Sequence, residues 1–143
     1  MHISSLIEGR ASSDIISVTV DQTVREAVKL LASKRIGALP VMSGGRVAGI
    51  FSERDVIYRL AEEGSACLDR PIGEVMTSPA ITVDREALVD RALALMTKRR
   101  IRHLPVLDGE AMCGFISIGD LVKSRIDEVQ HEADAMRDYI THA

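Results

Sequence analysis

The pattern Ser-x-x-Asp directly follows an apolar stretch at two places in the chain, Ser52–Asp55 and Ser117–Asp120. A serine that begins a helix accepts from the free backbone N–H groups of the first turn, and those groups also favour an anion or hydroxyl oxygens. The ionised carboxylate of either aspartate can accept hydrogen bonds from both hydroxyls of a ribose. Two interpretations are open: the pairs only cap helices, or they also bind a sugar.

A phosphate on such a sugar needs a cation from another part of the chain, because an aspartate repels it. The basic run Lys98–His103 is the candidate source, and Arg102 and His103 stand last in it. Arg99 and Arg100 are typical of a solvated helix end, where cations are favoured in any case. His103 fits a ligand contact and a partly buried structural role equally well.

The two halves of the chain are copies of one unit. The segment Gly37–Val41 matches Arg102–Val106 at a shift of 65, and this shift holds without a gap as far as the two aspartates. Upstream, Val18–Asp21 matches Ile81–Asp84 at a shift of 63, so one two-residue insertion separates the copies. Such a period is typical of repeated supersecondary units that share a core, and small molecules often bind in the cleft between them.

Each copy predicts the same order of elements: strand, helix, strand, strand, helix. In the first copy the capping box Thr23–Glu26 starts a helix that Gly37 is expected to end. Leu39–Met42 and Val47–Phe51 flank a turn and predict a hairpin. A second helix follows and ends at Gly64, and its inner face is expected to carry Val56, Ile57 and Leu60.

The composition is that of an ordinary globular protein, with 143 residues of which 46% are hydrophobic, 27% charged and 3% aromatic. A formal net charge of −3 and the scarcity of aromatic residues argue against a nucleic acid partner or an anionic membrane surface. Charged residues interrupt every apolar stretch before the roughly 18 residues that a membrane span needs. Cys67 and Cys113 show no metal-like spacing and the first residues no leader pattern, so we expect no metal site and a cytoplasmic location.

The last helix is predicted to run from Asp120 almost to the C-terminus, far beyond what the repeat needs. Apolar residues recur along it at spacings of 4, 3, 4, 3 and 4, a heptad pattern formed by Val122, Ile126, Val129, Ala133, Met136 and Ile140. We call this set the seam. A symmetric dimer through the seam is the preferred interpretation, and a strap formed with the chain's own N-terminal segment is the alternative.

An LPV strand, a turn, the pattern Gly-x-x-Ser-x-x-Asp and a closing helix occur together twice, and this combination resembles a tandem pair of CBS domains, the arrangement called a Bateman module. The two copies of the pattern are Gly49–Asp55 and Gly114–Asp120. The resemblance implies an α+β fold of two β-α-β-β-α units related by a pseudo-twofold axis, with an extended C-terminal helix. We expect the first unit and its lead-in at 1–66, the second at 67–125 and the helical extension at 126–143.

The resemblance also implies a regulatory module that senses an adenosine-containing molecule in the cleft: AMP, ADP, ATP, NAD(H) or S-adenosylmethionine, with Mg²⁺ accompanying a polyphosphate. The resemblance places the two residues before each LPV strand next to the phosphate. In this chain these residues are basic only in the second copy. Unequal sites are therefore predicted, with Arg102 and His103 reaching across the cleft. The full set of expected ligand contacts is Val18, Thr19, Gly37, Ala38, Ser52, Arg54, Asp55, Ile81, Thr82, Arg102, His103, Ser117 and Asp120.

Gly37 and Ala38 are expected to leave room for a flat base, which Val18 and Ile81 could sandwich. The output of such a sensor would be a homodimer or a separate effector protein. A dimeric interaction scaffold with vestigial nucleotide sites is the alternative function. An enzyme is not expected, because the sequence has no Gly-x-Ser-x-Gly elbow, no phosphate loop with Gly-Lys-Ser/Thr and no His-Glu-x-x-His.

Overall fold

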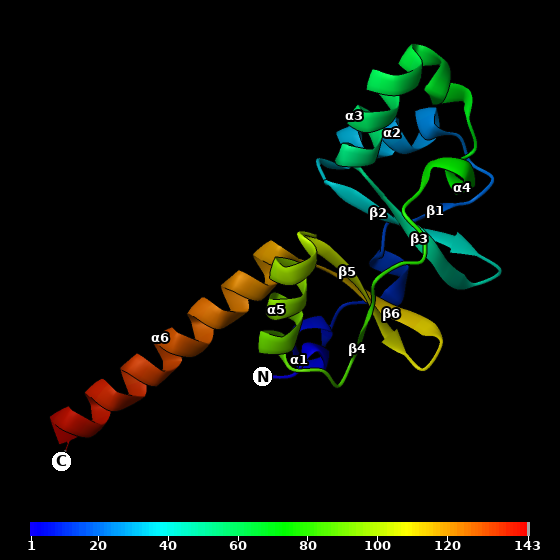
Figure 1. Cartoon of the computed structure of the whole chain (residues 1–143). Coiled ribbons are helices and arrows are strands. Elements are labelled where there is room, and N and C mark those ends of the chain that lie inside the picture. The colour runs from blue at the N-terminus through cyan, green and yellow to red at the C-terminus, as the bar shows by residue number, and fades with distance from the viewer. Residues whose placement is uncertain (143) are drawn as a thin grey trace.

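The sequence repeat appears in the computed structural model, which describes residues 1–142, as two three-stranded sheets of identical order. In each sheet a short first strand pairs parallel with the second, and the third returns antiparallel as a hairpin. The strands are β1 (Val18–Thr19), β2 (Ala38–Ser43) and β3 (Arg46–Ser52), then β4 (Val83–Asp84), β5 (His103–Asp108) and β6 (Ala111–Ser117). This arrangement confirms the α+β fold of two β-α-β-β-α units (Figure 1).

One helix joins the first two strands of each unit and another follows the hairpin. These helices are α2 (Val24–Lys34) and α3 (Glu53–Glu63) in the first unit, and α5 (Val89–Arg99) and α6 (Ile118–His142) in the second. Shorter helical segments lie between them: α1 (Ile3–Ile7), the 3₁₀ turn η1 (Ser12–Asp14), the 3₁₀ segment η2 (Gly64–Asp69) and α4 (Ile72–Val75).

Helix α2 begins as its capping residues predict but ends earlier than expected. The Thr23 hydroxyl accepts from the Glu26 N–H at 3.2 Å. The helix ends at Lys34, not at Gly37, because Arg35 adopts a left-handed conformation with φ 53°. The Ile36 N–H then donates to the Leu31 carbonyl, and Ile36 packs against the core. A partly buried isoleucine and a backbone hydrogen bond thus fix this helix end without glycine.

The two units exchange their lead-in segments. Ile3 and Ile7 of α1 lie in the core of the second unit, beside Val83, Val89 and other aliphatic residues. Ile72 and Val75 of α4 lie in the core of the first unit. The predicted boundary between the units lies at residue 66, whereas each packed unit contains a short helix from the other part of the chain.

Helix α3 turns Ile57 and Leu60 outward, so the expected inner face was wrong for these two residues and holds only for Val56. The exposed fractions are 62% for Ile57 and 41% for Leu60, and no residue of α3 is buried. The helix rests on the body through Val56 and through Glu63, which accepts from the Arg70 guanidinium at 2.7 Å. The apolar outer face of α3 therefore has no partner within the described part of the chain.

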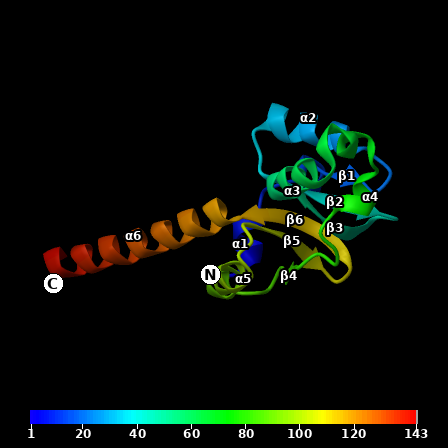
Figure 2. The ribbon, with the colours of Figure 1, turned by 45° about the horizontal axis from the view of Figure 1, so that its top comes forward.

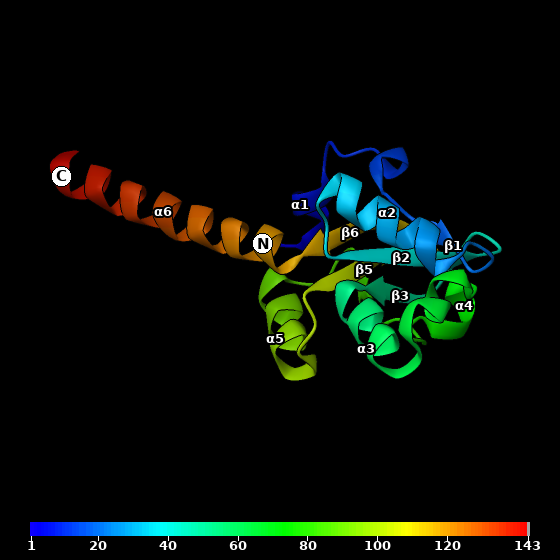
Figure 3. The ribbon, with the colours of Figure 1, turned by 90° about the horizontal axis from the view of Figure 1, so that it is seen from above.

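Helix α6 is continuous and extends away from the body, as Figures 1, 2 and 3 show. Only its first turns pack on the body, through the buried Leu121 and Ser124. The large seam residues stay exposed, from 44% at Val122 to 70% at Ile140. The N-terminal segment touches α6 near its base, where the Met1 amino group lies 4.0 Å from a Glu128 carboxylate oxygen. The far part of the seam is thus not covered by a strap.

The last residue of the predicted extension, Ala143, lies outside the described residues. Among the helices that the structure describes, none is both long enough and apolar enough to cross a membrane.

Candidate functional site

Both Ser-x-x-Asp pairs cap a helix, and in each pair the cap uses the same carboxylate oxygen. The Ser52 and Ser117 N–H groups donate at 2.9 Å to Oδ2 of Asp55 and Asp120, respectively. In return, the serine hydroxyl accepts from the aspartate N–H at 3.3 and 3.1 Å. The capping interpretation is therefore confirmed for both pairs, and Oδ1 of each aspartate is left for another partner. We call these the first and second corners.

The first corner is closed by the segment that connects the two units. Oδ1 of Asp55 accepts from the Thr77 hydroxyl at 3.1 Å. Thr77 is held in place because its backbone exchanges two hydrogen bonds of 2.9 Å with Ile50 on β3. A Cβ placed on Gly49 would lie only 2.6 Å from the Thr77 carbonyl oxygen. The connecting segment thus lies directly on the strand beside this corner.

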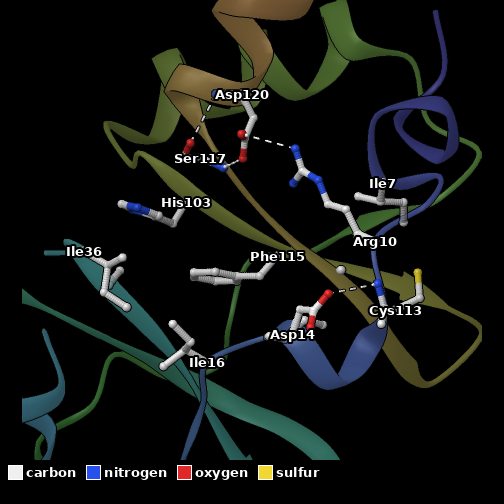
Figure 4. A pocket seen from close by; sticks show the side chains of 14 residues that line it. Ile7, Arg10, Asp14, Ile16, Ile36, His103, Cys113, Phe115, Ser117 and Asp120 are labelled. Atoms are coloured by element: carbon white, nitrogen blue, oxygen red, sulfur yellow. Dashed lines mark hydrogen bonds and ion pairs between the residues drawn. The ribbon is translucent and has the colours of Figure 1, made fainter. Parts of the chain in front are cut away.

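The second corner is open, and only a long side chain reaches it. Oδ1 of Asp120 meets Nη2 of Arg10 at 3.4 Å, in an ion pair whose side chains are 47% and 30% exposed. Arg10 belongs to the lead-in between α1 and η1. A cavity of about 270 Å³ lies here, and Ser117, Asp120 and Arg10 form its polar end (Figure 4).

Most other residues that line this cavity are apolar or aromatic. The ring of His103 stacks on Phe115, with ring centroids 5.6 Å apart and planes at 14°. Ile16 and Ile36 lie beside these rings in Figure 4, and Ala38 also lines the cavity. Planar, apolar walls next to a few polar groups are what a nucleobase with its sugar requires.

Burial favours the uncharged form of the His103 imidazole. Its burial lowers the pKa of the imidazole, and this effect exceeds the opposing influence of the Asp120 and Glu53 carboxylates, while the Arg102 charge adds to the lowering. Gly37 makes space for the ring, since a Cβ there would lie 3.4 Å from Cε1 of His103 and 3.3 Å from Oε1 of Glu53.

The structure brings together five of the expected contact residues. Ala38, His103, Ser117 and Asp120 line the cavity, and Gly37 lies against the His103 ring. Arg102 is exposed and is not among the lining residues. His103 lies at the corner of its own unit and its ring also lies against Gly37 of the first unit, whereas the expected reach toward a ligand across the cleft stays a prediction.

The other expected contacts lie elsewhere. Nη1 of Arg54 donates to the Arg100 carbonyl at 3.4 Å, which links the two units. Thr82 lines a separate cavity between β4 and α5. Val18 is buried in the first core, Ile81 packs against the second, and Thr19 is exposed on β1.

Arg10, Ile16 and Phe115 are among the contributors to the cavity that sequence reasoning missed. Phe115 is one of only two phenylalanines and stands where the first copy has Ile50, so the departure from the repeat was its signal. Ile16 lies two residues before the β1 strand. Arg10 follows the apolar lead-in and matches no basic residue in the other copy, so no pattern indicated it.

Burial raises the pKa of the Cys113 thiol, which keeps it protonated and a weak nucleophile. Within residues 1–142, no three His, Cys, Asp or Glu side chains gather where they could hold a metal ion.

Comparison with known proteins gives the same family for both halves. The model of the CBS domain matches residues 4–62 and 72–127. A curated relative, the mitochondrial CBS domain-containing protein CBSX3 of Arabidopsis thaliana, is 39% identical over 127 residues. That alignment covers 85% of this chain and 62% of the relative, so the chain spans less than two thirds of it.

Solved structures share the fold over most of the chain. A putative signal-transduction protein with CBS domains from Burkholderia ambifaria is 40% identical, with a TM-score of 0.81 over 89% of this chain and 95% of that one. The CBS pair of MJ0100, in complex with 5′-methylthioadenosine and S-adenosyl-L-methionine, is 25% identical, with a TM-score of 0.73 over 86% and 98%. CBSX2 in complex with AMP is 22% identical, with a TM-score of 0.74 over 88% and 96%.

The doubled sheet order, the two capped Ser-x-x-Asp corners and the double match lead to one conclusion: the chain belongs to the CBS domain family and carries two tandem CBS domains.

Proposed function

We propose that this protein is a regulatory module that binds one adenosine-containing nucleotide at the second corner. The observation that carries the proposal is the position of the Asp120 carboxylate. Its Oδ1 is not used by the helix cap and lies at the polar end of a largely apolar cavity. A ribose diol can donate to that oxygen while the base lies along Phe115 and the two isoleucines.

The ligands of similar proteins support an adenosine group. AMP in CBSX2 and the two ligands of MJ0100 differ at the 5′ position and have only adenosine in common. The cavity of about 270 Å³ lies near the lower end of the sizes typical of ligand pockets, which suits a single nucleoside. The candidates remain AMP, ADP, ATP, NAD(H) and S-adenosylmethionine, with Mg²⁺ accompanying a polyphosphate.

The site suits one ligand for each chain. In the first corner, Thr77 already satisfies the oxygen of Asp55 that a ribose would need. A ligand there would have to break this hydrogen bond and displace the connecting segment from β3. We therefore assign the nucleotide to the second corner.

Binding would be transmitted through a homodimer to an effector protein, with no reaction catalysed by this chain. Residues of both units line the cavity, so a ligand can favour one arrangement of the two units over another. The free energy of this shift cannot exceed the difference between the ligand's binding free energies to the two arrangements. The exposed seam of α6 and the exposed apolar face of α3 support a second copy as partner. The free thiols of Cys67 and Cys113 accord with a reducing compartment such as the cytoplasm.

Isothermal titration calorimetry with the five candidate nucleotides tests the proposal, with ATP titrated both with and without Mg²⁺. We expect saturable binding of at least one nucleotide with one site per chain. Two equal sites per chain would contradict the assignment to the second corner, and no binding by any nucleotide would refute the sensor and favour the scaffold.

A further inference from the structure

We propose that Arg10 is the phosphate-binding residue of this site, and that it exchanges the Asp120 carboxylate for the ligand's phosphate when a nucleotide binds. The inference rests on the proposed function and adds what the site selects: a nucleoside 5′-phosphate over the nucleoside alone.

The ion pair stands where the ligand has to bind. Ser117 already occupies Oδ2 of Asp120, so a ribose competes with Arg10 for Oδ1. The Arg10 side chain is nearly half exposed and comes from a segment outside the regular helices and strands. Its guanidinium can therefore turn away from Asp120 without disturbing a core residue.

The charges around the cavity leave no other strong candidate for the phosphate. Among the described residues that line it, Arg10 is the sole lysine or arginine, whereas Asp14 and Asp120 are acidic. The Asp14 carboxylate accepts from the Ala11 N–H at 3.3 Å and so belongs to the η1 turn. Arg102 and His103 were the expected phosphate contacts, but Arg102 does not line the cavity and burial favours the uncharged form of His103.

A nucleotide can satisfy both members of the ion pair at once. The ribose diol takes Asp120, and the phosphate offers Arg10 a charged acceptor of the kind guanidinium prefers. Adenosine also takes Asp120 but leaves Arg10 without a partner. The ion pair thus makes the site selective. The cost of separating Arg10 from Asp120 is compensated only by a ligand that carries both a ribose diol and a phosphate.

The first corner lacks this device. There the donor to the aspartate is the neutral hydroxyl of Thr77, which has no charge to offer a phosphate. The two corners therefore differ in more than the access of a ligand to the aspartate. In the second corner the partner of the aspartate is a charged side chain that can move, whereas in the first it is a neutral hydroxyl.

The test measures the affinities of AMP and adenosine by calorimetry for the wild type, Arg10→Gln and a matched control, Arg25→Gln. Arg25 forms an ion pair of the same kind, with Nη2 3.3 Å from Oδ1 of Asp69 and a half-exposed side chain, but it does not line the cavity. Arg10→Lys serves as the conservative variant, because lysine keeps the charge and loses the bidentate fork.

We expect the wild type to bind AMP at least about tenfold more tightly than adenosine, as one charge-assisted contact predicts. Arg10→Gln should weaken AMP by about tenfold or more and leave adenosine unchanged or tighter, because Asp120 is no longer occupied. Arg10→Lys should fall between these two, and Arg25→Gln should match the wild type for both ligands.

Opposite responses of the two ligands cannot come from a loss of folding, which would weaken both. If Arg10→Gln weakens AMP and adenosine equally, Arg10 is only a structural residue and the inference is overturned. If it leaves AMP unchanged, the phosphate is held elsewhere and the inference is again overturned, while the proposed function stands. If the wild type binds neither AMP, adenosine nor any other nucleotide of the panel, the proposed function falls and the inference with it.

Discussion

The substitutions Asp55→Asn and Asp120→Asn form a matched pair that separates helix capping from ligand binding. Both aspartates receive a serine N–H at 2.9 Å and sit in the same capping arrangement. The expected loss of stability is therefore similar in the two variants, about 1 kcal/mol each, as for other capping residues. Thermal unfolding of both proteins without ligand should confirm this similarity.

Nucleotide affinity should respond in one of the two variants only. A hydrogen bond to a charged acceptor contributes about 1.5–3 kcal/mol and one to a neutral acceptor about 0.5–1.5 kcal/mol, so two ribose hydroxyls lose roughly 2–3 kcal/mol in Asp120→Asn. Releasing the exposed ion pair with Arg10 offsets up to about 1 kcal/mol of this loss. The net loss is about 2 kcal/mol, or roughly 30-fold in Kd.

Calorimetric titration with the tightest-binding nucleotide of the panel measures this difference. Asp55→Asn should stay within about threefold of the wild type, because Thr77 already occupies the oxygen in question. Equal losses of affinity in the two variants would refute the assignment of the ligand to the second corner. An unchanged affinity in Asp120→Asn would refute the role of this carboxylate altogether.

Three further outcomes follow from the structure. Burial lowers the pKa of His103 in the folded state, so the unfolded chain takes up a proton first as the pH falls through 6.5. The stability that the neutral imidazole contributes should therefore be complete above that pH and decline below it. Melting temperatures measured at pH 5 and pH 7.5 should show a smaller decline in His103→Gln than in the wild type. Gly49→Ala should cost about 1–3 kcal/mol by thermal unfolding, because its Cβ meets the Thr77 carbonyl oxygen at 2.6 Å. Gly114→Ala should cost less, because its Cβ meets only side-chain atoms, the nearest being Cγ2 of Ile7 at 3.0 Å; a reversed order would contradict the close cover of the first corner. Truncation after Arg125 removes most of the seam and should convert a dimer to a monomer, as measured by sedimentation equilibrium. The affinity for AMP should change less than about threefold. A truncated chain that remains dimeric would place the interface elsewhere, such as on α3.

The repeat allowed most of the fold to be predicted, because each local signal agreed with the next. The capping residues, the hairpins and the doubled strand order all appear where the patterns placed them. The outward turn of Ile57 and Leu60 was not predictable in the same way. Apolar periodicity shows which residues share a helix face, but it does not show whether the body of the same chain or a second molecule covers that face.

The candidate site was predictable at its polar corner and less so elsewhere. Ser117 and Asp120 follow from a motif whose chemistry is local to one helix turn. Arg10 and Ile16 come from a segment without periodicity that reaches the second corner only through the packing of α1. The closing of the first corner likewise depends on the long-range pairing of Thr77 with β3, for which the sequence carries no short-range signal.

The exchange of α1 and α4 has a consequence for how the protein unfolds. Neither half is complete on its own stretch of chain, so one half cannot melt without pulling a helix out of the other. A gene cut at codon 66 would yield two fragments, each lacking the helix that the other carries, and we expect soluble, structured protein only when both are produced together. The swap therefore makes the tandem pair, and not the single repeat, the smallest piece that folds cooperatively.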